Sequence, residues 1–147
     1  MTEMKVGDKF PDFKLLDENG EQFDSAMLIG VRYVIYFYEG DNDEEGIRET
    51  LDFNSIYPKL MLRNVPVIGV SGDDVVSHQR FILSNGLKIK LLADTDHDLT
   101  EKVCIHGEKG VTSIINKEGM VEAIWYDTYT EGHTDRVYER IRSIMKV

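Results

Sequence analysis

The sequence predicts an α/β fold with a mixed central sheet, helices on both faces and an N-terminal β-hairpin. Three observations lead to this prediction. Strand-like apolar runs alternate with helical periodicity, two turn signals mark hairpins, and the 147 residues suit one domain covering 1–147. The composition, 41% hydrophobic and 30% charged, is that of a globular protein that can bury a core without disulfides.

The first predicted elements are a hairpin and a buried strand. Residues 13–16 and 21–23 flank residues 17–20, which end in Asn-Gly, and Asn-Gly favours the φ > 0 turn of a hairpin. Residues 31–38 form a nearly continuous β-branched and aromatic run. Such a run is typical of a strand that is buried on both faces.

A long helix and a second buried strand follow. Apolar residues at helical spacing predict a helix over 44–63, and Pro58 should bend it because proline removes one backbone hydrogen bond. Residues 65–70 read as the second strand. The residues that set the helical spacing are Ile47, Leu51, Leu60 and Met61.

The second half of the chain continues the alternation. A helix is expected after Ser71 or Asp73, because either residue can act as its N-cap. Residues 90–93 form a short strand and residues 94–98 open another helix. The apolar residues of the helix expected after Ser71 or Asp73 are Val75, Phe81 and Ile82.

The chain is expected to end in a hairpin and a helix. Residues 111–115 and 120–125 are joined by the turn Asn-Lys-Glu-Gly at 116–119. The final helix shows the clearest amphipathic pattern, with apolar residues at i, i+4, i+7 and i+8. These residues are Val137, Ile141, Ile144 and Met145.

Charge and cysteine content exclude several classes of function. Seventeen Lys and Arg against 27 Asp and Glu give a net charge of -10, which disfavours nucleic acid and anionic membranes as partners. The N-terminus lacks a signal-like apolar core, and no apolar run approaches the roughly 18 residues of a membrane span. With a single cysteine, the chain is expected to be cytoplasmic, and no cofactor is expected.

Short motifs that recur in one order along the whole chain resemble the peroxiredoxin family, in particular its bacterioferritin comigratory or Q-type members. The resemblance implies a thioredoxin-like fold and descent from antioxidant thiol peroxidases, which are oxidoreductases. It also suggests a homodimer. The motifs are VGDKFPDF at 6–13, YFY at 36–38, DF at 52–53, VIGVS at 67–71, SH at 77–78, LLAD at 91–94, NKEG at 116–119 and GH at 132–133.

The residues that carry the chemistry of that family differ in this chain. Where the family has Pro, Thr and the peroxidatic cysteine after the 31–38 strand, the gapless alignment gives Glu39, Asp43 and Gly46. The resolving cysteine of many Q-type members falls at Leu51, and the catalytic arginine at Gly110. We therefore expect no catalytic residue, but a remodelled pocket made of Tyr36, Tyr38, Glu39, Asp43, Gly46 and Gly110.

The loop at this position is also electrostatically unsuited to a reactive thiol. Glycine offers no nucleophile, and five of the eight residues 39–46 are carboxylates, which would disfavour a thiolate. The sequence thus predicts a protein that lacks peroxidase activity and binds an unknown protein or small molecule. The carboxylates have a simple structural explanation, because they are favourable at a helix N-terminus.

Two alternatives remain open. Cys104 could serve a weak thiol-dependent peroxidase or a redox sensor, although an isolated cysteine is most often a buried apolar residue. A weak cation site could form, because acidic residues follow part of a calcium-loop spacing. Its candidate ligands are Asp41, Asp43, Glu45 and Asp52. The four histidines, His78, His97, His106 and His133, show no zinc spacing and are expected at the surface or at helix caps.

Overall fold

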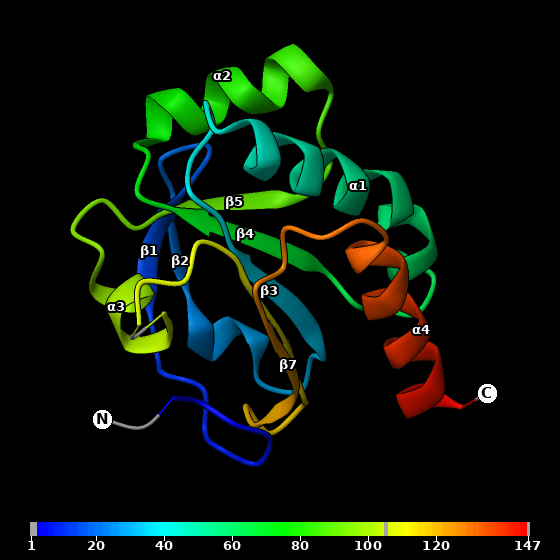
Figure 1. The fold of residues 1–147 in the computed structure, drawn as a ribbon. Helices are drawn as coiled ribbons and strands as arrows, with labels where there is room; N and C mark the ends of the chain where they lie inside the picture. The colour runs from blue at the N-terminus through cyan, green and yellow to red at the C-terminus, as the bar shows by residue number, and fades with distance from the viewer. Residues whose placement is uncertain (1–2, 105, 147) are drawn as a thin grey trace.

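The computed structural model describes residues 3–104 and 106–146, which build one seven-stranded sheet with helices packed against it (Figure 1). The strand order is β2-β1-β5-β4-β3-β6-β7. The strands are β1 (Lys14–Asp17), β2 (Gln22–Asp24), β3 (Tyr33–Phe37), β4 (Val67–Ser71), β5 (Lys90–Ala93), β6 (Val111–Ile115) and β7 (Val121–Tyr126). The helices are η1 (Ser25–Leu28), α1 (Glu44–Met61), α2 (Val75–Asn85), α3 (Asp98–Val103) and α4 (His133–Met145).

The sheet is mixed, as the sequence predicts. Strands β3, β4 and β5 are parallel, whereas β1 and β6 join them in antiparallel fashion at either side. Each parallel strand is followed by a helix, so α1, α2 and α3 all begin near one edge of the sheet. The carboxyl ends of parallel strands are where α/β proteins bring chemical groups together.

The helices pack on both faces of the sheet, and each face has its own apolar core. On one face, Tyr36 and Tyr38 pack with Phe53 of α1 and Val137 of α4. On the other face, buried residues of α3 and of the N-terminal segment pack on Ile35 and Phe37. The expected helices on both faces are therefore confirmed. Within the described residues, no helix is long and apolar enough to cross a membrane.

The predicted elements are present, but two details were wrong. Of the residues that set the helical spacing, Leu60 is buried, but Leu51 and Met61 are 39% and 38% exposed, because α1 turns Phe53, Ile56 and Leu60 toward the sheet. Helix α2 is capped by neither Ser71 nor Asp73, but by Asp74, whose carboxylate accepts the Ser77 N–H at 2.9 Å. The helix therefore begins directly after Asp74. Asp73, which is not the cap, is available for other contacts.

Candidate functional site

The residues of the expected pocket gather where β3 ends and α1 begins. Tyr36 and Tyr38 point to the α1 face, and both are buried. The Tyr36 hydroxyl donates to Thr50 Oγ1 at 2.8 Å, and its ring stacks on Phe53 with centroids 4.7 Å apart. Burial raises the pKa of both tyrosines well above the ordinary value. These rings therefore fill the core beneath the site and do not line an open pocket.

Gly46 lies in the first turn of α1, as the alignment anticipates. Its N–H donates to Asp43 Oδ2 at 2.9 Å, because Asp43 is the N-cap of the helix. A Cβ at this position would lie 3.1 Å from Tyr38 Cδ2, 3.2 Å from the Gly40 carbonyl oxygen and 3.3 Å from Asp43 Oδ2. The space beside Gly46 is therefore filled, and the nearest charged group is a carboxylate.

Gly110, which precedes β6, is also enclosed. A Cβ here would overlap Thr128 Oγ1 and approach Tyr129 Cε1 to 3.2 Å. The Tyr129 hydroxyl accepts the backbone N–H of Glu39 at 2.8 Å, whereas the Glu39 side chain is exposed. Residues after β7 thus occupy the room that a side chain at position 110 would need.

Cys104 is remote from Gly46. It belongs to the core on the opposite face of the sheet, with Val103 and Phe37, and it is 7% exposed. Burial, reinforced by the charges of Glu108 and Asp94, raises the pKa of its thiol to about 12. A thiol with such a pKa is almost entirely protonated at neutral pH and is a poor nucleophile.

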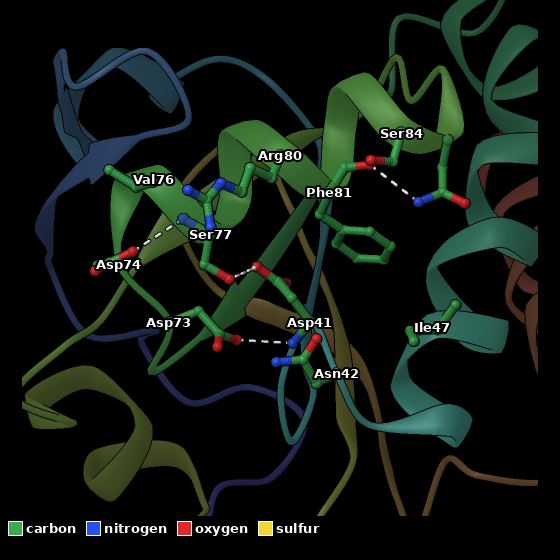
Figure 2. A pocket seen from close by; sticks show the side chains of 11 residues that line it. Asp41, Asn42, Ile47, Asp73, Asp74, Val76, Ser77, Arg80, Phe81 and Ser84 are labelled. Carbon is green, nitrogen blue, oxygen red and sulfur yellow. Dashed lines mark hydrogen bonds between the residues drawn. The ribbon is translucent and has the colours of Figure 1, made fainter.

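A buried hydrogen-bond network lies beside the site, at the start of α2 (Figure 2). The Asp41 carboxylate accepts from Tyr38 at 2.6 Å and from Ser77 at 2.8 Å, and its Oδ2 lies 2.8 Å from Nδ1 of His78. Burial by itself raises the pKa of Asp41, but the contacts with His78, Tyr38 and Ser77 outweigh burial and lower it. Asp73 Oδ2 accepts from the Asp41 N–H at 2.8 Å and from the Ser71 hydroxyl at 2.6 Å.

A cavity of about 660 Å³ opens next to this network, between the β3–α1 loop and α2 (Figure 2). Among the described residues of its lining, Arg80 is the one Lys or Arg, beside three carboxylates. Polar side chains dominate the wall, so the cavity suits a polar or charged occupant. Its lining residues include Asp41, Asn42, Asp73, Asp74, Ser77 and Ser84.

A second buried polar group lies one turn along α1 from Gly46. Glu49 is 5% exposed, and neither of its carboxyl oxygens has a hydrogen-bond partner among residues 3–104 and 106–146. Its Oε2 lies 3.7 Å from Nε2 of His133, and it shares a cavity of about 20 Å³ with Thr128. Burial raises the pKa of Glu49 to about 8, while burial and Arg136 lower that of His133 to about 4.

The acidic residues expected to bind a cation do not converge. Asp43 caps α1, Glu45 is exposed, and Asp52 lies with Glu45 along the small cavity beside Glu49. In the described part of the chain, one group of three or more acidic, cysteine or histidine side chains is close enough to share an ion. It contains Asp41, Asp73 and His78. No pattern in the sequence indicated this group. The expectation of a surface or capping position was wrong for His78, which is fully buried within α2. His133 is also buried; it begins α4 but makes no capping hydrogen bond.

Comparisons with known proteins point to one family. The chain matches the AhpC/TSA family over residues 6–124. It is 30% identical to peroxiredoxin Bcp of Escherichia coli, with 93% of this chain and 95% of that protein covered. It is 28% identical to the chloroplastic peroxiredoxin Q of Arabidopsis thaliana, with 97% of this chain and 69% of that protein covered.

Solved structures agree on the fold. A cysteine mutant of peroxiredoxin Q from Xylella fastidiosa superposes with a TM-score of 0.90 at 23% identity, and the match covers 99% of this chain and 100% of that one. A bacterioferritin comigratory protein of Xanthomonas campestris, studied for alkyl peroxide reduction, gives 0.85 at 26% identity over 97% and 98%. These similarities confirm the expected thioredoxin-like peroxiredoxin fold.

Proposed function

The chain belongs to the AhpC/TSA family, and from this premise we propose that it is a non-catalytic, ligand-binding peroxiredoxin rather than a thiol peroxidase. One observation carries the proposal. The first turn of α1, where the alignment places the attacking sulfur, holds Gly46, and the single cysteine lies on the opposite face of the sheet. Reduction of a peroxide by this family needs a thiolate that attacks the O–O bond.

The electrostatics around Gly46 support the same proposal. A thiolate is stabilised by a neighbouring cation or a helix N-terminus. At Gly46 the helix N-terminus is already capped by Asp43, and Gly110, where the alignment places the family's arginine, contributes no side chain. Negative charge near position 46 would keep a thiol there protonated. The surroundings would therefore disfavour the reaction even if a cysteine replaced Gly46.

The binding role rests on the cavity beside α2. Its volume of about 660 Å³ falls within the range of small-molecule sites. Asp41 lines this cavity and is held from behind by His78, and the exposed Arg80 and Asn42 also line it. We propose a small polar molecule as occupant, and a second copy of the chain as the protein partner to test.

Peroxide consumption tests this function directly. Wild type and Cys104→Ser are incubated with hydrogen peroxide or an alkyl hydroperoxide and dithiothreitol, beside peroxiredoxin Bcp of Escherichia coli as the active reference. We expect wild type and Cys104→Ser to consume peroxide no faster than the blank that contains dithiothreitol alone. Turnover at the rate of the reference would refute the proposal. Activity that disappears in Cys104→Ser would instead support the redox alternative.

A further inference from the structure

Three metal-ligating side chains from separate segments meet at the carboxyl edge of the sheet. Asp41 follows β3, Asp73 follows β4, and His78 lies in the first turns of α2. One potential ligand atom of each residue lies within 4.8 Å of the other two. Asp41 is 7% exposed and His78 is fully buried. Two carboxylates and an imidazole thus share a site that is largely shielded from solvent.

The surroundings hold these ligands in fixed orientations. Nε2 of His78 lies 3.0 Å from the carbonyl oxygen of Leu92. A carbonyl can only accept, so Nε2 carries the hydrogen and Nδ1 is directed at Oδ2 of Asp41. Histidines that bind metals usually donate their second N–H to a carbonyl or carboxylate in this way, and the carboxylates in turn accept hydrogen bonds. Tyr38 and Ser77 donate to Asp41.

The contact between His78 and Asp41 marks the place where an ion would lie. With the hydrogen on Nε2, the neutral ring turns the lone pair of Nδ1 toward Oδ2 of Asp41, 2.8 Å away. Two electron-rich atoms at this distance need a positive charge between them. Within the described residues, no Lys or Arg forms an ion pair with Asp41 or Asp73. A proton shared by Nδ1 and Oδ2 can fill this place, and a metal ion can replace that proton.

We propose that Asp41, Asp73 and His78 bind a divalent transition-metal ion, for which Zn²⁺ is the probe. Imidazole favours zinc and its neighbours, whereas calcium needs six to eight oxygen ligands, which this group does not offer. Three protein ligands with one position left open are typical of reactive zinc sites. The ion takes the place of the proton between Nδ1 and Oδ2, and that proton leaves to solvent.

The three ligand atoms, which lie within 4.8 Å of one another, have to rearrange to tetrahedral spacing to accommodate the ion. Zinc binds nitrogen and oxygen at about 2.0–2.2 Å, so two ligands in a tetrahedral site lie roughly 3.3 Å apart. The contact of 2.8 Å between His78 and Asp41 has to widen by about half an ångström. Asp41 and Asp73 also line the cavity of about 660 Å³, which supplies an entry path and room for a water or ligand at the open position. The proposal does not depend on the lack of peroxidase activity.

Metal binding is measured on the whole chain after treatment with EDTA. Calorimetric titration with Zn²⁺ at pH 7.5 is expected to give one ion per chain. Titration with Co²⁺ is expected to give visible d–d bands that Zn²⁺ removes and Ca²⁺ does not. The Co²⁺ spectrum reports a nitrogen- and oxygen-ligated site in the unmodified protein, so this readout needs no variant.

Two matched variants assign the site. Asp73→Asn removes a ligand charge but keeps an oxygen that can accept from Ser71 and from the Asp41 N–H, and we expect Zn²⁺ to bind at least roughly tenfold more weakly. Asp74→Asn makes the same change one residue along, in the same cavity, and keeps the N-cap of α2, so binding should change less than about twofold. Absence of stoichiometric binding, or equal weakening by both variants, would overturn the proposal.

Discussion

The buried carboxyl of Glu49 makes the stability of the protein depend on pH in a way that one substitution can remove. Both oxygens lack a hydrogen-bond partner within residues 3–104 and 106–146, so the charged form is uncompensated. Burial raises the pKa to about 8, and the charge of Asp52 adds to this effect. Glu49→Gln keeps the size and polarity of the side chain but cannot ionise.

The magnitude follows from the two pKa values. In the unfolded chain Glu49 ionises near its ordinary value of 4.5, and in the folded chain near 8. Between these pH values the folded state binds the additional proton, so the free energy of unfolding falls as the pH rises. At about 1.4 kcal/mol per pH unit, the loss reaches about 5 kcal/mol at pH 8, and relaxation of the cavity makes this an upper bound.

His133 makes the free energy of unfolding depend on pH in the opposite direction. Burial and the charge of Arg136 lower its pKa from 6.5 to about 4, so its contribution to stability is complete above pH 6.5 and is lost as the pH falls to 4. Between pH 4.5 and 6.5 the two groups nearly cancel in the wild type. We therefore expect a plateau there, followed by a fall of about 2 kcal/mol between pH 6.5 and 8.

Urea unfolding at half-unit steps from pH 5 to 9, followed by circular dichroism, measures this curve. Glu49→Gln should rise in stability from pH 5 to 6.5 and stay level above it, and it should exceed the wild type at pH 9. Glu44→Gln, an exposed carboxylate in the same helix, serves as the control and should keep the wild-type shape. Parallel curves for wild type and Glu49→Gln would refute the reasoning.

Four further substitutions test the surroundings of Gly46. Gly46→Cys should stay at the blank rate in the peroxide assay, and its thiol should react with iodoacetamide only above pH 8.5, because Asp43 Oδ2 lies beside it. Asp43→Ala removes the N-cap of α1 and should cost about 1 kcal/mol in urea unfolding, whereas Asp43→Asn should cost little. Tyr36→Phe leaves the buried Thr50 hydroxyl without its donor and should cost about 1–2 kcal/mol by the same measurement.

Local periodicity was enough to predict the elements of the fold, since every predicted strand and helix is present. The boundaries of β5, residues 90–93, agree with the prediction. The exposed positions in α1 could not be predicted, because Leu51 and Met61 have the same apolar character as the residues that face the sheet. Which stripe of a helix is buried depends on the sheet it packs against, and the one-dimensional pattern does not contain that information.

The candidate site was predictable only in part, for a related reason. Gly46 could be placed in the first turn of α1 because it lies close in sequence to the end of a strand. Apart from Tyr38, the partners of Asp41 come from α2 and from the segment after β4, more than thirty residues away, and they meet it because β3 and β4 are parallel neighbours. An Asp following each of two buried strands was the one available signal. Nothing local connects Glu49 with His133.

A side chain at position 110 and the Thr128 side chain would need the same space, so substitutions at the two positions should be energetically coupled. A Cβ at position 110 would overlap Thr128 Oγ1, an atom with no hydrogen-bond partner in the described ranges. Gly110→Ala should therefore cost about 1–3 kcal/mol by overpacking, and Thr128→Ala should recover most of that cost when the two are combined. Additive effects in this double-mutant cycle would show that the space is not occupied. A cooperative result would mean that an arginine cannot return to position 110 unless the segment after β7 changes with it.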